Sequence, residues 1–344
     1  MIRILSAGDL VYHELPRGCY TPIHTFQKSL NFKHLERNSY LSVVTDKYEL
    51  GPVNILIDKI EEKIIGRIIL TDTAIILTTG IYNFSKFNLY DSTFPVNEDT
   101  NNNKSIKQLT KNLELLKKFL INFRIRNSIF LPFVNDSSFC YTENMNKYPI
   151  QEKTDRLPMF SSCQRENTNN TCEELLPPTK NQQQETAYRG LTSLEKTLRK
   201  RIIEVFDQIH KRKILKAVRL LRGVGIGFTP SGDDFIMGLV LAINLRIKLG
   251  ISHQKNVLPS NLFARKYEEL KKQIIKIAYY GNDFMDFHLK LISDYRVPLK
   301  IKLMLEWLMN GSKINLQKYI SPLAKTGHSS GMDIICGFIT GMEF

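Results

Sequence analysis

A glycine-rich segment that ends in hydroxyl and acidic residues is the part of the sequence best suited to chemistry. Residues 223–238 read Gly-Val-Gly-Ile-Gly-Phe-Thr-Pro-Ser-Gly-Asp-Asp-Phe-Ile-Met-Gly and lead into an apolar helix. Glycines permit tight turns and a close approach of the backbone to a ligand. Free N–H groups and hydroxyls at a helix start favour an anion. The expected donors are Gly225, Gly227, Thr229, Ser231 and Gly232.

A second segment near the C-terminus repeats part of this pattern. Residues 327–337 read Gly-His-Ser-Ser-Gly-Met-Asp-Ile-Ile-Cys-Gly, and both segments contain Ser-Gly-x-Asp-x-Ile-x-Gly, 99 residues apart. Each copy places a hydroxyl and a carboxylate at a helix start, with a small residue on the next turn where another helix can pack closely. We therefore expect the two helix starts to face each other across one site. The second copy adds Ser329, Ser330 and Gly331 as donors, and His328 as an acid, a base or a hydrogen-bond donor.

Helix capping is the alternative explanation of both segments. Ser231 with Asp234, and Ser330 with Asp333, match the Ser-x-x-acid pattern in which a side chain caps the first turn. Acidic residues there also suit the helix dipole. Capping does not account for the glycine run, the double Asp or His328. If capping is the whole explanation, the protein is a non-catalytic scaffold subunit.

The acidic residues of the two segments would repel an anion unless a cation or a basic group neutralises them. Mg²⁺ often bridges carboxylates and a phosphate, so it is the one candidate cofactor. Its candidate ligands are Asp233, Asp234 and Asp333. Of the first two, Asp234 is the better cap and Asp233 the freer ligand. The candidate catalytic residues are Ser231, Asp233 and His328.

The segments lie in a region that is expected to be helical, within a chain of the α+β class. Residues 191–344 predict a mainly helical domain, whereas residues 135–190 are polar and predict an insertion or linker. Residues 1–130 predict a β-rich domain, a small antiparallel sheet or barrel, with a trailing helix over 105–124. The clearest predicted strands of that domain are 40–44, 53–57, 64–70 and 73–78.

Composition excludes several classes of protein. The chain has 344 residues, of which 42% are hydrophobic and 24% charged, as in folded soluble proteins of about two domains. The apolar run 235–243 is far shorter than the ~18 residues that a membrane span requires, and the N-terminus does not resemble a secretory signal. The 5 cysteines form no Cys-x-x-Cys pair. Free thiols, a cytoplasmic location and no membrane association are therefore expected.

The net charge of +14 leaves nucleic-acid binding as a further alternative. Basic residues are concentrated over 196–222, which we expect to form a helix. No aromatic residues are interleaved there for base stacking, and no zinc-finger or RNA-binding signature is present. A lysine-rich solvated surface accounts for the charge more simply, so nucleic acid is not the expected partner.

The two motif segments together resemble the AllH-like family, which is linked to the oxamate carbamoyltransferase of allantoin degradation. Members carry a glycine-rich loop that ends in Thr-Pro-Ser-Gly-Asp-Asp-Phe and a late Gly-His-Ser/Thr-Ser-Gly-x-Asp segment. Residues 27–32 and 48–55, Gln-Lys-Ser-Leu-Asn-Phe and Tyr-Glu-Leu-Gly-Pro-Val-Asn-Ile, are also similar. Ile226 and Phe228 replace the Pro and Leu that are usual in the family loop. The resemblance does not cover residues 135–190.

The resemblance implies one subunit of a multi-subunit transferase that converts carbamoyl-oxamate and phosphate to oxamate and carbamoyl phosphate, or the reverse. The expected partners are other subunits and a small anion such as carbamoyl phosphate, phosphate or an oxamate-like molecule. In this hypothesis the glycine-rich loop holds anionic oxygens, Asp233 holds a cation or an amino group, and His328 donates to the group transferred.

Overall fold

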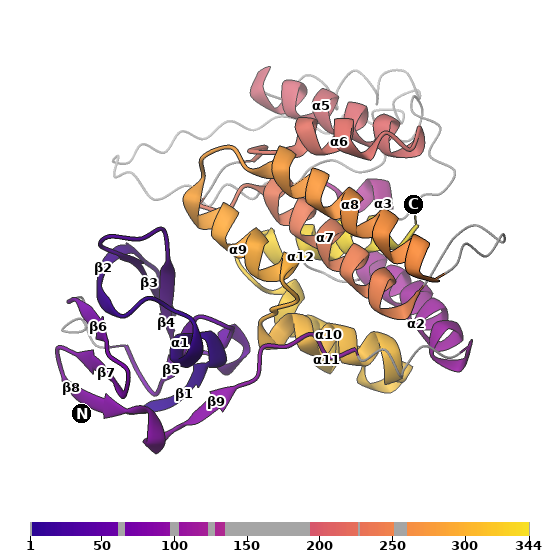
Figure 1. Ribbon diagram of the computed structural model, residues 1–344. Helices are drawn as coiled ribbons and strands as arrows, with labels where there is room; N and C mark the ends of the chain where they lie inside the picture. Colours follow the sequence, from indigo (N-terminus) through magenta and orange to yellow (C-terminus); the bar gives the residue numbers. More distant parts are fainter. Residues whose placement is uncertain are drawn as a thin grey trace, which may run out of the picture.

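The structure of the chain is a computed structural model. It describes residues 2–60, 66–96, 103–122, 128–134, 193–225, 228–250 and 260–343. A sheet lobe comes first and a helical lobe follows (Figure 1), which confirms the expected α+β class. The predicted polar insertion over 135–190 and the predicted donor Gly227 lie outside the described residues. No helix in the described part of the chain has the length and hydropathy needed to cross a bilayer.

The sheet lobe is one curled sheet with the strand order β8-β7-β6-β2-β3-β4-β5-β1-β9. Its strands are β1 (Ile4–Gly8), β2 (Gly18–Thr25), β3 (Ser29–His34), β4 (Tyr40–Val44), β5 (Asn54–Ile57), β6 (Ile68–Leu70), β7 (Ala74–Leu77), β8 (Gly80–Asn83) and β9 (Asn88–Tyr90). A short helix, α1 (Asp9–His13), follows β1. The curled sheet agrees with the expected small antiparallel sheet or barrel except in two pairings, because β4–β5 and β1–β9 are parallel. Between β4 and β5 the chain crosses back through a 3-10 turn (Lys47–Glu49), and parallel strands require such a crossover.

Strands β3 and β4 have two chemically different faces. Leu30, Phe32, Leu41 and Val43 lie in the apolar core of the sheet lobe. Their neighbours point to the opposite face, because successive side chains of a strand alternate. There Asn31 lies opposite Ser42 and is bonded to it, with Ser42 Oγ donating to Asn31 Oδ1 at 2.7 Å. Both residues are only 6% exposed, so this polar face is covered by the helical lobe.

The helical lobe contains α2 (Asn103–Asn122), α3 (Leu131–Val134), α5 (Ser193–His210), α6 (Ile214–Leu221), α7 (Ser231–Leu249), α8 (Ser260–Ala278), α9 (Asp283–Ser293), α10 (Leu299–Asn310), α11 (Leu316–Ala324) and α12 (Ser330–Glu343). Helix α2 matches the helix predicted over 105–124. The prediction of one continuous basic helix is wrong, because α5 and α6 are separate helices. The break falls at Arg212, whose φ of 57° lies in the left-handed region.

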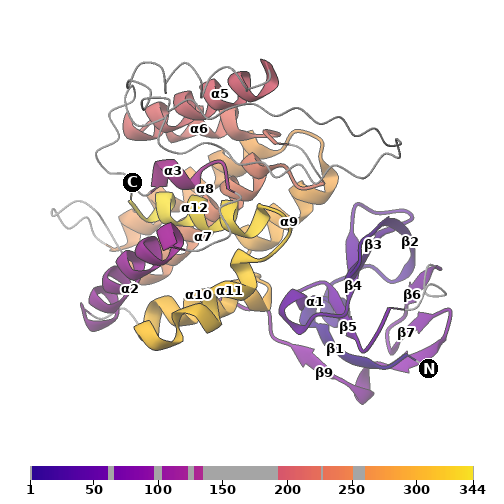
Figure 2. The same ribbon diagram turned by 180° about the vertical axis from the view of Figure 1, so that it is seen from behind.

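Helices α7 and α12 form the most extensive contact between elements of the described chain. They run parallel, since Gly337 meets Phe235 and Gly341 meets Ala242. The spacing leaves no room for side chains at the crossing: a Cβ on Gly238 would lie 2.1 Å from the carbonyl oxygen of Ile334, and one on Gly337 would lie 2.0 Å from that of Phe235. Figure 2 shows α12 along α7, with α3 beside it. The glycines of the repeated motif thus bring the two helix starts together.

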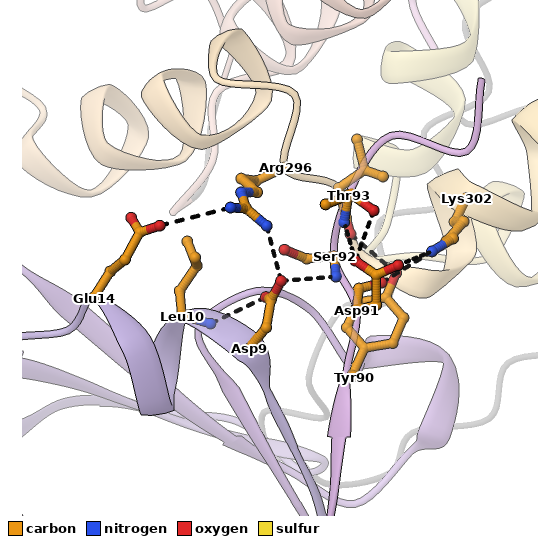
Figure 3. A network of polar contacts seen from close by, with 10 residues as sticks. Asp9, Leu10, Glu14, Tyr90, Asp91, Ser92, Thr93, Arg296 and Lys302 are labelled. Carbon is orange, nitrogen blue, oxygen red and sulfur yellow. Dashed lines mark hydrogen bonds and ion pairs between the residues drawn. The ribbon is translucent and has the colours of Figure 1, made fainter. Parts of the chain in front are cut away.

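Polar contacts join the two lobes (Figure 3). Arg296, in the turn between α9 and α10, donates from Nη1 to Asp9 Oδ2 at 2.8 Å, and its Nη2 lies 3.6 Å from Glu14 of the sheet lobe. The same Asp9 oxygen accepts from the N–H of Ser92 at 3.2 Å. Lys302 of α10 donates to the carbonyl oxygen of Asp91 at 3.0 Å. These contacts fix the position of the sheet beside α9 and α10.

Candidate functional site

A cavity of about 1450 Å³ lies between the sheet lobe and the helical lobe. Its sheet wall contains the polar face of β3–β4 and the turn after β4. Its helical wall contains the start of α7, the inner sides of α9 to α11 and the start of α12. All four segments that carry the family resemblance contribute: Gln27 to Asn31, Tyr48 to Asn54, Thr229 with Asp234, and Gly327 to Ser330. This shared cavity defines the candidate site.

Four hydroxyl groups meet where α7 and α12 begin. Thr229 Oγ1 lies 2.9 Å from Ser330 Oγ, and Ser231 Oγ lies 3.3 Å from Ser329 Oγ. Each contact joins the first segment to the second. The two helix starts therefore face each other, as the repeated motif predicted.

The first turns of both helices use part of their N–H groups within the protein. The N–H of Gly232 donates to Val224 O at 2.7 Å, and the N–H of Gly331 donates to Thr326 O at 3.1 Å. A Cβ on Gly232 would lie 1.9 Å from the carbonyl oxygen of Leu221 in α6, and one on Gly331 would lie 1.7 Å from that of Leu323 in α11, so both positions require glycine. The N–H groups of Ser231 and Ser330 donate to no other described residue. Ser330 lines the cavity whereas Ser231 does not, so of these two the N–H of Ser330 is the backbone donor available to a ligand there.

The capping explanation is wrong for the first copy of the motif. The N-cap of α7 is Pro230, which provides no side-chain cap, and Ser231 is already the first helical residue. Its hydroxyl faces Ser329 of the other segment rather than the backbone of its own helix.

Asp234 and Asp333, at equivalent positions of the two copies, are buried next to the opposite helix start. Asp234 is 1% exposed and Asp333 is 0% exposed. Burial raises the pKa of Asp234 to about 8, against the effect of the Ser330 and Thr229 hydroxyls, and the nearby Asp333 raises it further. Burial likewise raises the pKa of Asp333 to about 6, opposed by the hydroxyls of Ser128, Ser329 and Ser231. At neutral pH, Asp234 is thus a protonated acid that can donate a hydrogen bond into the cavity it lines.

Asp233 has a different position from its neighbour. It is 7% exposed, and its Oδ1 accepts from the N–H of Gly223 at 2.8 Å. Its Oδ2 accepts from the hydroxyl of Tyr280 at 2.6 Å. Burial raises the pKa of Asp233, while these two donors lower it. The carboxylate thus fastens the first glycine of the loop to the turn after α8, and Asp233 is absent from the lining of the large cavity.

The rim of the cavity near α12 is basic. His328 is exposed there, and Lys318 and Lys325 are exposed on and just after α11. Lys300, a buried residue of the lining, is paired with Glu49, Nζ to Oε2 at 2.6 Å. Gly225, a predicted donor, adjoins Ser231 but is not part of the lining. The basic rim provides the positive charge that an anionic ligand requires.

The three candidate ligands for Mg²⁺ do not form one set. Asp234 and Asp333 lie at the helix starts, whereas the carboxylate of Asp233 is bonded to Gly223 and Tyr280. The described part of the chain contains no group of three or more His, Cys, Asp or Glu side chains placed to hold a metal ion.

Several residues that line the cavity were not singled out in the sequence. Asn31 and Ser42 come from the sheet, and His288 comes from α9. Asn31 lies within the family-like segment 27–32, which was a signal for the sheet wall. His288 had no such signal, because only the packing of α9 against the sheet brings it to the cavity.

The comparison with known protein families supports the resemblance. Residues 221–342 match the family model described as oxamate carbamoyltransferase subunit AllH. The match begins in α6 and includes both motif segments and all of the helical wall. The sheet lobe lies outside the matched residues. No curated protein and no solved structure gave a significant match.

Proposed function

We propose that the chain is a subunit of a carbamoyl-transferring enzyme and that the starts of α7 and α12 bind its small anionic substrate. The family match supports a carbamoyltransferase-related subunit, and the family's description as a subunit implies that further subunits complete the enzyme. The observation that carries the proposal is that the hydroxyl residues Thr229, Ser329 and Ser330 and the buried acid Asp234 line one cavity where α7 and α12 begin.

The arrangement suits transfer of an acyl-type group. In one direction of the proposed reaction, a phosphate oxygen attacks the carbamoyl carbon of carbamoyl-oxamate. The bond from that carbon to the oxamate nitrogen breaks, and the nitrogen takes up a proton. Negative charge develops on the carbamoyl oxygen before the bond breaks.

Each part of the site has a role in this proposal. The N–H group of Ser330 and the acid proton of Asp234 donate to the oxygen that becomes charged. The hydroxyls of Thr229, Ser329 and Ser330 hold phosphate oxygens. Lys318 and Lys325 at the rim attract the anion from solvent. The cavity exceeds the ~300–1000 Å³ typical of a site for one ligand, so both small reactants fit within it.

The test is a binding titration of the purified chain with carbamoyl phosphate, phosphate and oxamate, each with and without Mg²⁺. We expect at least one of them to raise the melting temperature, because a ligand bound only to the native state stabilises it. Replacement of Ser330 by Ala should weaken that binding about tenfold, since one hydroxyl contact across the site is lost. Thr110→Val is the matched control, because its hydroxyl is exposed on α2 and bonds only its own helix.

Two results would contradict the proposal. One is the absence of binding by any of the three anions, with or without Mg²⁺. The other is unchanged binding in Ser330→Ala together with a lowered melting temperature, which would make the hydroxyl pairs structural and favour the scaffold alternative.

A further inference from the structure

Besides the starts of α7 and α12, polar residues of β3 and α9 line the cavity. Helix α9 lies on the polar face of β3–β4: Tyr40 packs against Phe284 and Phe287, with ring centroids 5.4 Å apart in both pairs. At the same end, Lys33 Nζ lies 2.9 Å from Asp283. These contacts hold the start of α9 over Lys33 and Tyr40. One turn after Phe284, His288 lines the same cavity as Asn31, which lies two residues before Lys33 on β3.

The hydrogen bonds of His288 determine which ring nitrogen is free. Its Nδ1 lies 2.8 Å from the carbonyl oxygen of Phe284, which can only accept, so Nδ1 carries the proton. Burial lowers the pKa of His288, and the nearby Lys300 charge lowers it further, so the ring is neutral at pH 7. Its Nε2 therefore has an unshared electron pair, and no described residue donates a hydrogen bond to it. The ring presents an acceptor to the cavity.

Asn31 presents the complementary group. Its Oδ1 accepts from Ser42 Oγ at 2.7 Å, which fixes the orientation of the amide. The Nδ2 group has no hydrogen bond to a described residue, so it is available as a donor. The site thus combines a fixed neutral acceptor on α9 with a fixed neutral donor on β3.

We infer that His288 and Asn31 form a subsite for the amide end of a small carboxamide ligand. His288 Nε2 accepts from the ligand N–H, and Asn31 Nδ2 donates to the ligand carbonyl oxygen. Neither group carries a charge, so the subsite selects an amide over a carboxylate or a methyl ketone by hydrogen bonding. The inference rests on the proposed function for the ligand class and adds the residues that recognise its neutral end.

The test compares oxamate with pyruvate, because the two monoanions have the same shape and differ only in NH₂ against CH₃. The unmodified chain should bind oxamate about tenfold more tightly, since only the amide donates to His288. His288→Asn retains a donor for Phe284 O but removes Nε2, and it should abolish this preference. Asn31→Asp should weaken the binding of both ligands and leave the ratio of their affinities unchanged. Phosphate affinity, which depends on the helix starts, should not change in His288→Asn.

His210→Asn is the matched control, because His210 Nδ1 contacts Phe206 O at 2.7 Å in the same geometry on α5, away from the cavity lining. Its preference for oxamate should equal that of the unmodified chain. Equal binding of oxamate and pyruvate by the unmodified chain would overturn the inference, as would a preference that persists in His288→Asn. Absence of phosphate binding in the unmodified chain would instead contradict the proposed function. The ratio of its affinities for oxamate and pyruvate can still be measured in that case.

Discussion

The two copies of the Ser-Gly-x-Asp motif differ mainly at one position. Ser231, Gly232, Asp234 and Gly238 correspond to Ser330, Gly331, Asp333 and Gly337, and each pair has the same place at the helix crossing. The intervening residue is Asp233 in the first copy and Met332 in the second. Asp233 is bonded to the loop and to Tyr280, whereas Met332 is 0% exposed in the apolar core.

This difference separates two roles within one motif. The shared residues create the crossing, one member of each hydroxyl pair and the two buried acids. The unshared residue anchors what precedes each helix: a carboxylate fastens the long glycine-rich loop, and an apolar side chain suffices for the shorter turn before α12. Three measurements test this difference. They ask whether substitutions at the shared positions have equal effects in the two copies, and whether the position that differs has an effect of its own.

The largest expected effect is at the crossing glycines. Gly238→Ala should lower the free energy of unfolding by about 4 kcal/mol, because its Cβ would lie 2.1 Å from a backbone oxygen that cannot move without displacing α12. Gly337→Ala should cost a similar amount if the copies are equivalent. Gly281→Ala is the control: it has no atom within 4 Å of the added Cβ, and its φ of 97° should cost about 1 kcal/mol through backbone strain alone. Urea unfolding of the three variants makes the comparison, and equal costs at all three positions would refute close packing as the cause.

The second effect is pH-dependent and should distinguish the two acids. The folded-state pKa of Asp234, about 8, lies above its ordinary value of 3.8, so the folded state binds its proton more tightly. The destabilising effect of this group therefore grows as pH rises from about 4 to about 8. Asp234→Asn should thus melt like the unmodified chain near pH 4 and be more stable by on the order of 3 kcal/mol at pH 9.

The corresponding gain for Asp333→Asn should be complete near pH 6, since the pKa of Asp333 is about 6. Asp72→Asn is the control, because that side chain is 90% exposed. Melting temperatures across pH 4 to 9 provide the measurement. A gain that has the same pH midpoint in both variants would show that the two acids titrate as one unit.

The smallest effect concerns the unshared position. Tyr280→Phe removes the donor to Asp233 and should cost about 1 kcal/mol, because the bond is charge-assisted but partly exposed. Tyr279→Phe, at the neighbouring and similarly exposed ring, should change the free energy of unfolding little. Chemical unfolding gives the free energy of unfolding of both variants. Equal values would mean that the Tyr280 hydroxyl does not stabilise Asp233.

The sequence predicted the parts of the molecule that depend on local patterns. Short β-branched runs between turn residues predicted the strands at 40–44 and 53–57, and the repeated motif predicted that the two helix starts face each other. The expectation that Asp233 is the freer ligand is wrong, because its carboxylate is bonded to Gly223 and Tyr280. The sequence carries no local signal for the side of α7 on which the turn containing Tyr280 packs. The polar wall from Asn31 and His288 depends on docking of α9 onto the sheet, for which one sequence has no local signal.

The cavity has one further consequence. Residues 221–342 account for its helical wall, whereas β3, β4 and the turn after β4 lie before the segment that matches the family. Two chains with the same helical wall would therefore have different cavities if their sheets differed. In the proposed subsite, Asn31 of β3 supplies one polar group and His288 of α9 the other, so assigning a substrate requires comparison of both the N-terminal lobe and the helical wall.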